Sequence, residues 1–153
     1  MSSIEPYLPI IYDLALDCEN ITEIGVNRGN TTNIILKACE ITQGRLTSID
    51  KNDPLVFSTN SKKWLFIKSD CLEYYPDKNI DFLLIDCDPS IELTKKILSR
   101  YGKFVKKYIV IHDTIFYQLN EILIEWAVEN GFWYLELDKK RYGLMILWSH
   151  LKA

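Results

Sequence analysis

Carboxylates and one histidine stand at the ends of apolar runs along this sequence. Asp50, Asp70 and Asp86 each follow such a run closely, and His112 with Asp113 ends another. A carboxylate can accept hydrogen bonds from sugar hydroxyls, hold a cation or take up a proton, and an imidazole exchanges a proton near neutral pH. Because ligands bind beyond the carboxyl ends of parallel strands, we expect these side chains to gather at one edge of a sheet.

A glycine-containing stretch from Glu23 to Thr32 follows the first apolar run. Glycines between a strand and a helix let the backbone pass close to a ligand and aim helix amides at it. The dinucleotide fingerprint G-x-G-x-x-G would need glycine at positions 27 and 30, and both are asparagine, which tolerates left-handed turn positions. Asp50 lies about twenty residues beyond Gly29, where a carboxylate can accept both hydroxyls of a ribose. The pattern favours a nucleoside-containing ligand without a pyrophosphate.

Short apolar runs rich in Ile and Val are typical of strands that are buried on both faces of a parallel sheet. Such runs occupy residues 21–26, 45–49, 64–67, 82–85 and 108–111. Helical patterns separate them at 30–39, 90–101 and 115–129, with helix starts at Asp88-Pro89 and a turn or short helix at Asp53-Pro54. Strand alternating with helix predicts βαβ units with right-handed crossovers.

The pattern changes near the end of the chain. Two strand-like runs, 132–137 and 143–148, flank a charged turn and predict a hairpin. We therefore expect an α/β fold of three layers, Rossmann-like, with a seven-stranded, mostly parallel sheet and a C-terminal antiparallel hairpin. Residues 1–153 are expected to form a single domain, in which residues 1–20 are a short N-terminal covering segment.

Composition limits the classes of function. The chain has 153 residues, 48% of them hydrophobic and 25% charged, which excludes disordered and collagen-like proteins. A net charge of -3 disfavours nucleic acid and membranes as partners, and the basic residues between 95 and 107 are expected to form a solvated helix face. The four cysteines fall singly, which argues against a zinc site. Single cysteines fit free thiols in a reducing compartment, so we expect a cytoplasmic protein.

Taken together, these motifs resemble those of class I S-adenosylmethionine-dependent methyltransferases, from residue 22 onward. The resemblance rests on the loop from Glu23 to Thr31 and on strand-end residues at Asp50, 69–71, Asp86 and 112–114. Residues 80–88 and 109–114 are similar in style to small-molecule O-methyltransferases of the macrocin and cephalosporin-tailoring type. Each motif alone is common, but five in register form a joint signal for the fold and the cofactor.

The resemblance implies that S-adenosylmethionine is the cofactor. Asp50 would bind its ribose, with Lys51 beside the adenine edge, and Asp86 would lie beside the methionine amine. The other implied contacts are Glu23, Gly25, Asn27 and Gly29 to the methionine part, and Asp70 and Cys71 to the adenine. Asp50 and Asp70 could instead be ordinary loop carboxylates, and Cys87 is interpreted as a packing residue.

The resemblance also implies methyl transfer to a hydroxyl of a small-molecule acceptor, with Asp86, His112 and Asp113 as the catalytic candidates. In related metal-dependent O-methyltransferases, carboxylates after the fourth and fifth strands and an asparagine hold a divalent ion. Asp86 and Asp113 match these carboxylates and predict Mg²⁺, whereas Thr114 stands where asparagine would be. Without a metal, His112 would be the general base, although it could also be a buried histidine at a strand end.

About twenty residues precede the first predicted strand, whereas the resembled enzymes commonly carry a longer extension or lid. The acceptor side is therefore expected to be open or completed by a second copy, which predicts a homodimer. The alternative function is a non-catalytic S-adenosylmethionine-binding module, or a subunit with decayed acceptor machinery. The sequence leaves the identity of the acceptor open.

Overall fold

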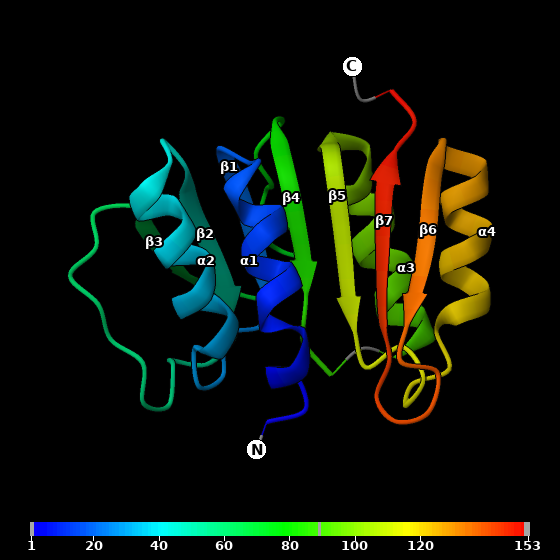
Figure 1. Cartoon of the computed structure of the whole chain (residues 1–153), viewed down its shortest axis with the longest axis horizontal. Helices are drawn as coiled ribbons and strands as arrows, with labels where there is room; N and C mark the ends of the chain where they lie inside the picture. The colour runs from blue at the N-terminus through cyan, green and yellow to red at the C-terminus, as the bar shows by residue number, and fades with distance from the viewer. Residues whose placement is uncertain (1, 89, 152–153) are drawn as a thin grey trace.

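Seven strands form one sheet in the computed structural model, which describes residues 2–88 and 90–151. Their bounds are β1 (Asn20–Ile24), β2 (Arg45–Asp50), β3 (Trp64–Lys68), β4 (Ile80–Ile85), β5 (Val105–His112), β6 (Phe132–Leu137) and β7 (Leu144–Ser149). The strand order is β3-β2-β1-β4-β5-β7-β6 (Figure 1). β1 to β5 pair in parallel, and β7 pairs antiparallel with both β5 and β6. The predicted fold class is confirmed.

Helices cover both faces of the sheet (Figure 1). Their bounds are α1 (Leu8–Leu16), α2 (Asn30–Ile41), α3 (Ile91–Tyr101) and α4 (Asn120–Asn130), with short 3-10 turns η1 (Glu5–Tyr7) and η2 (Gly102–Phe104). α1 and α2 pack on one face of the sheet, and α3 and α4 pack on the other. None of these helices, within the part of the chain that the structure describes, has the length and apolar character needed to cross a membrane.

The central strand β4 shows why the apolar runs become buried strands. Successive side chains of a strand point to opposite faces of the sheet. Leu83 and Ile85 pack in the core beneath α3 and α4, whereas Phe82 and Leu84 pack in the core with α1 and α2. All four side chains are fully buried, as expected for a parallel strand between two helical layers.

One predicted helix start and one predicted helix cap, that of Asp88, are wrong. α4 begins at Asn120 instead of residue 115, because the chain first turns back and the amide of Ile115 donates to the carbonyl of Tyr142 at 2.8 Å. α3 is capped by the side chain of Ser90, which accepts from the amide of Leu93. Asp88 is therefore not the cap, and Pro89 lies outside the described residues. The chain after Asp53 forms bends and no helix.

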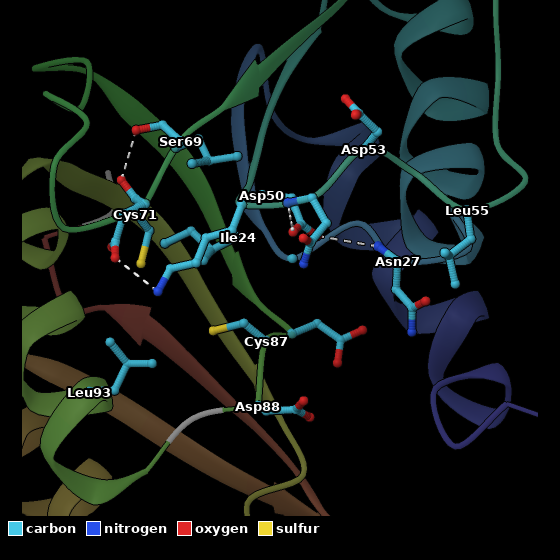
Figure 2. Close-up of a pocket in the computed structure, with 16 residues that line it drawn as sticks. Ile24, Asn27, Asp50, Asp53, Leu55, Ser69, Cys71, Cys87, Asp88 and Leu93 are labelled. Atoms are coloured by element: carbon cyan, nitrogen blue, oxygen red, sulfur yellow. Dashed lines mark hydrogen bonds and ion pairs between the residues drawn. The ribbon is translucent and has the colours of Figure 1, made fainter.

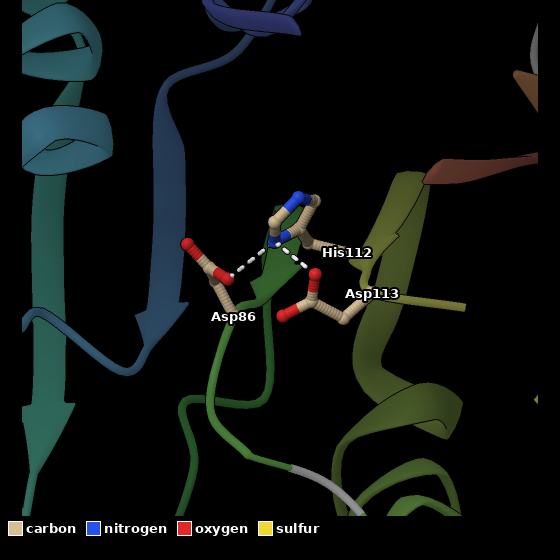
Figure 3. A group of neighbouring side chains, drawn as sticks. All are labelled: Asp86, His112 and Asp113. Carbon is tan, nitrogen blue, oxygen red and sulfur yellow. Dashed lines mark hydrogen bonds and ion pairs between the residues drawn. The ribbon is translucent and has the colours of Figure 1, made fainter. Parts of the chain in front are cut away.

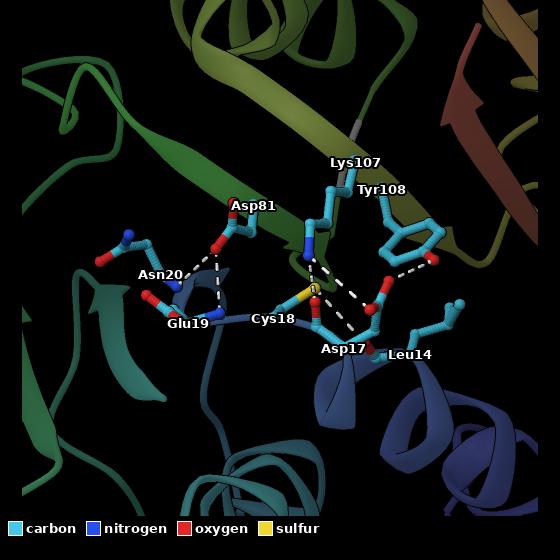
Figure 4. Close-up of polar contacts among 8 residues, drawn as sticks. All are labelled: Leu14, Asp17, Cys18, Glu19, Asn20, Asp81, Lys107 and Tyr108. Atoms are coloured by element: carbon cyan, nitrogen blue, oxygen red, sulfur yellow. Dashed lines mark hydrogen bonds and ion pairs between the residues drawn. The ribbon is translucent and has the colours of Figure 1, made fainter. Parts of the chain in front are cut away.

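Polar contacts tie strands together at the edge of the sheet opposite the predicted site (Figure 4). Oδ2 of Asp81 accepts from the amides of Glu19 and Asn20 at 2.9 and 3.0 Å, which holds the start of β1 against β4. The hydroxyl of Tyr108 donates to Asp17 at 2.9 Å and joins β5 to the end of α1. These contacts therefore fasten β1, β4 and β5 to one another and to α1 at the amino ends of the strands.

Candidate cofactor pocket and active site

The loop after β1 passes very close to the end of β4. Gly25 has a φ of +93°, and a Cβ atom there would lie 2.2 Å from the carbonyl oxygen of Asp86. The amide of Gly25 donates to the carbonyl of Ile49, so the loop is also held against β2. Asn27 takes a left-handed conformation with a φ of +51°, as the sequence allowed. The loop requires glycine at position 25 because backbone occupies the place of a side chain.

Asp50, at the end of β2, organises the same loop. Its Oδ2 accepts from the amides of Val26 and Asn27 at 2.8 and 3.4 Å, and its Oδ1 accepts from the amide of Asn52 at 2.9 Å. Figure 2 shows this carboxylate between the loop and the segment that follows β2. The carboxylate therefore holds two loops together at one wall of a pocket.

That pocket has a volume of about 510 Å³ and lies at the carboxyl ends of β1, β2, β3 and β4 (Figure 2). Its apolar wall contains Ile24, Ile49 and Leu93. Nζ of Lys51 lies 2.9 Å from Oδ2 of Asp70. Among the residues that the structure describes, the charged ones that line the pocket are Lys51 and five aspartates, Asp50, Asp53, Asp70, Asp86 and Asp88.

Asp70 is held ionised by its neighbours. The amide of Leu72 donates to its carboxylate, and the ammonium of Lys51 lies against it, so the pKa of Asp70 is lowered from its ordinary value. Two further lining residues carry thiols. Burial raises the pKa of Cys87 to about 12 and also raises the pKa of Cys71. Both side chains are therefore neutral thiols, which fits packing and not nucleophilic attack.

Asp86, His112 and Asp113 come together beside this pocket (Figure 3). Nδ1 of His112 lies 2.9 Å from Oδ1 of Asp86 and 3.4 Å from Oδ1 of Asp113. His112 is 1% exposed, whereas the side chains of Asp86 and Asp113 are 23% and 21% exposed. The histidine thus lies behind two carboxylates that reach solvent.

The environment changes the proton affinity of this group. Burial lowers the pKa of His112, but the hydrogen bond to Asp86 and the charges of Asp86 and Asp113 outweigh it, so the net pKa is raised. Burial raises the pKa of Asp113 above its ordinary value, although the charge of His112 opposes this. The ring of Tyr7 packs edge-on against His112 with 5.7 Å between centroids. The N-terminal segment therefore covers the histidine.

Glu23 lies in a buried polar network and does not line the pocket. Its side chain is 0% exposed and accepts hydrogen bonds from the hydroxyls of Thr31, Thr32 and Ser48. Burial raises the pKa of Glu23 to about 7, although the three hydroxyls act in the opposite direction. Because Thr31 and Thr32 stand in the first turn of α2, the network fixes the helix that follows the glycine loop.

Comparison with known proteins identifies the architecture. The sequence matches no protein-family model and no curated protein. The structure is similar to a putative caffeoyl-CoA O-methyltransferase from Staphylococcus aureus, with a TM-score of 0.74 and 19% identity over 94% of this chain and 83% of that chain. It is also similar to a putative ribosomal RNA methyltransferase from Plasmodium falciparum, with a TM-score of 0.71 and 17% identity over 97% and 96% of the two chains.

A third similar structure is the O-methyltransferase from Bacillus cereus in complex with SAH, with a TM-score of 0.64 and 13% identity over 97% of this chain and 82% of that chain. The chain has the fold of class I S-adenosylmethionine-dependent methyltransferases. Identities of 12 to 19% among the similar structures make this a statement about the fold.

The methyltransferase fold gathers most of the residues predicted to bind the cofactor. Glu23 lies in its buried network, and Gly29 stands at the start of α2, where a Cβ atom would lie 2.3 Å from the ring of Phe57. Neither residue is part of the lining. The predicted residues that do line the pocket are Gly25, Asn27, Asp50, Lys51, Asp70, Cys71 and Asp86.

Other lining residues were not predicted. Asn52 and Asp53 directly follow Asp50 and Lys51, so their place after a strand end could have indicated them. Leu55 and Leu93 come from a loop and from the first turn of α3, where no sequence motif marks them. Their position depends on how the methyltransferase fold brings these segments to the strand ends.

Proposed function

We propose that this chain binds S-adenosylmethionine in the pocket at the ends of β1 to β4 and transfers its methyl group to a hydroxyl of a small molecule. The observation that carries the proposal is the charge of the lining, in which five aspartates face one lysine that is already paired with Asp70. Such a lining attracts a ligand that carries positive charge on its sulfur and its amine, and it repels a pyrophosphate.

The residues present fit this cofactor. The carboxylate of Asp50 accepts hydrogen bonds from three backbone amides. Because a carboxylate can accept about four hydrogen bonds, it can also accept one from a ribose hydroxyl. Asp86 supplies a negative charge for the amine, and Ile24, Ile49 and Leu93 supply apolar contact for a purine ring. Bound S-adenosylmethionine supplies a methyl group that the positive sulfur has already activated for displacement.

The protein must then orient the acceptor and take its proton. His112 is too buried to meet an acceptor directly, and its Nδ1 holds Asp86 and Asp113 in place. Oδ1 of Asp113 is buried against that nitrogen, which leaves Oδ2 as the atom that receives the hydroxyl proton. A raised pKa makes this carboxylate a better base than an ordinary aspartate, because its proton affinity lies closer to that of the acceptor.

The arrangement bears on the predicted Mg²⁺ ion. Nδ1 of His112 lies within 3.4 Å of one oxygen of each carboxylate, so the ring nitrogen is already the partner of both. A ring nitrogen that donates a proton to a carboxylate cannot also ligate a metal. The group therefore fits an imidazole held between two carboxylates better than it fits a magnesium ion, and no step here requires a metal.

We also propose that the chain forms a homodimer. Support comes from β6, which is the last strand of the sheet and exposes the apolar side chains of Trp133, Tyr134 and Leu135. An exposed strand edge with apolar side chains is a surface that proteins usually cover. Sedimentation at micromolar concentration should show a dimer that Trp133→Lys converts to a monomer, and a monomeric wild type would contradict the proposal.

Transfer of an isotope-labelled methyl group tests the activity. The protein is incubated with methyl-labelled S-adenosylmethionine and a panel of phenols and aliphatic alcohols, and labelled ethers are quantified. We expect transfer to at least one hydroxyl compound and a loss of transfer in Asp113→Asn, with Asp13→Asn, an exposed aspartate on α1, as the matched control. Cofactor binding without transfer to any compound would contradict catalysis and favour a non-catalytic binding module.

A further inference from the structure

A second groove lies on the face of the molecule that carries α3. It has a volume of about 540 Å³ and runs between α3 and the segment that leads from β3 to β4. Of the residues that the structure describes, none lines both this groove and the cofactor pocket. Its lining residues include Tyr75, Lys78, Lys96, Arg100, Lys103 and Phe104.

The groove is lined by positive charge alone. Four of its described lining residues are lysine or arginine, and none is aspartate or glutamate. Nζ of Lys96 lies 2.7 Å from Oε1 of Glu92 on the same helix, and Glu92 does not line the groove. Within residues 2–88 and 90–151, the other three cations form no ion pair. Their charge therefore remains for an anionic ligand, although the chain as a whole is acidic.

Aromatic rings stand beside these cations. Tyr75 is 85% exposed, and the guanidinium carbon of Arg100 lies 5.2 Å from the centre of its ring. Nε of Arg100 donates to the carbonyl of Tyr74 at 2.8 Å, which fixes the guanidinium in place. Nζ of Lys103 lies 5.0 Å from the centre of the Phe104 ring. The groove thus offers flat apolar surface and positive charge side by side.

We propose that this groove binds a phosphorylated ligand that also carries a planar ring, namely a nucleotide. The phosphates would contact Lys78, Arg100 and Lys103, and the base would stack on the exposed ring of Tyr75. Rings next to cations are the combination by which proteins hold bases and phosphates without reading sequence. The same chemistry is offered by a free nucleotide and by a nucleotide within a single RNA strand. This site does not depend on methyl transfer.

Calorimetric titration with uridine diphosphate tests the proposal, because this probe lacks the adenine expected in the cofactor pocket. We expect it to bind more tightly than uridine or inorganic phosphate. Lys78→Glu combined with Lys103→Glu should weaken it at least about tenfold, since each lost phosphate contact is a charge-assisted hydrogen bond. Tyr75→Ala should weaken it several-fold. Lys37→Glu, the same type of substitution made at one exposed site on α2, should leave the affinity within about twofold.

Two further titrations test whether the site is separate from the cofactor pocket and which source of nucleotide it binds. Saturating S-adenosylhomocysteine should leave the affinity for uridine diphosphate unchanged, and competition between them would overturn the proposal of a separate site. A four-residue oligouridylate that binds more tightly than the diphosphate, and loses affinity in the double variant, would assign the source to an RNA strand. Equal affinities would assign a free nucleotide. Absence of binding by either probe, or equal losses in Lys37→Glu and the double variant, would overturn the proposal.

Discussion

Nδ1 of His112 lies 2.9 Å from Oδ1 of Asp86, and this contact joins the ends of β5 and β4. Ile85 of β4 pairs with Ile111 of β5. Asp86 and His112 come directly after these paired residues and therefore lie side by side. Asp86 also lines the pocket at the carboxyl ends of β1 to β4. The contact therefore connects the proposed cofactor site, through His112, with Asp113, the carboxylate that would receive the acceptor's proton.

Gly25→Ala should unfold or severely destabilise the protein. The substitution adds backbone strain at a positive φ and drives a Cβ atom into the carbonyl of Asp86. The matched control is Gly131→Ala, which has a similar φ of +74° but meets no described atom within 4 Å. Urea unfolding should show a loss of about 1 to 2 kcal/mol for the control and several kcal/mol more for Gly25→Ala. Equal losses would contradict the close approach of the loop to β4.

Glu23→Gln should change how stability depends on pH. Burial raises the pKa of Glu23 to about 7, so between pH 4.5 and 7 the unfolded chain releases a proton that the folded chain retains. The free energy of unfolding contributed by this group is fully present below pH 4.5 and falls as pH rises to about 7. Glutamine cannot ionise, so the stability of the variant relative to wild type should rise over this range by an amount on the order of 3 kcal/mol.

Urea unfolding at several pH values measures this difference. Glu125→Gln is the matched control, because Glu125 is exposed on α4 and makes the same chemical change. Its stability relative to wild type should be nearly constant with pH. A constant difference for Glu23→Gln as well would show that the buried network does not hold the proton.

Asp50→Asn should weaken binding of S-adenosylmethionine. The change removes the negative charge that holds the amides of Val26 and Asn27 and that would face the ribose. We expect an affinity loss of about tenfold to a hundredfold, on the scale of a charged hydrogen bond. Asp13→Asn should bind as wild type does. Normal affinity in Asp50→Asn would remove this residue from the site.

Chelation should leave methyl transfer unchanged. Nδ1 of His112 stands between the carboxylates, and the proposed proton acceptor is Oδ2 of Asp113. His112→Ala should therefore lower kcat, because both carboxylates lose the group that positions them. The rate is measured with and without EDTA for both proteins. Loss of the wild-type rate on adding EDTA, with recovery on adding Mg²⁺, would restore the metal hypothesis.

The sequence predicted the sheet well because burial on two faces leaves a strong pattern. Apolar runs such as 82–85 can be interpreted without knowing their neighbours, and the turn before β7 marks the hairpin. The start of α4 was missed because it depends on a contact between Ile115 and Tyr142, which are far apart in the chain. A pattern within a short stretch of sequence cannot predict a contact between residues that are far apart in the chain.

The candidate site was partly predictable for the same reason. Residues at strand ends, such as Asp50 and Asp86, have positions that follow directly from the fold. The role of Glu23 did not follow, because its burial depends on hydroxyls supplied by α2 and β2. The position of His112 behind two carboxylates, and the groove beside α3, depend on side-chain packing that the sequence pattern does not record.

Calorimetric titration of the wild-type protein with S-adenosylmethionine tests the central claim most directly. The acidic lining of the pocket predicts one site per chain that binds S-adenosylmethionine, and weaker binding of NAD, whose pyrophosphate the aspartates repel. Asp50→Asn in the same titration assigns the heat to this pocket. No heat with S-adenosylmethionine, together with binding of NAD, would contradict the claim.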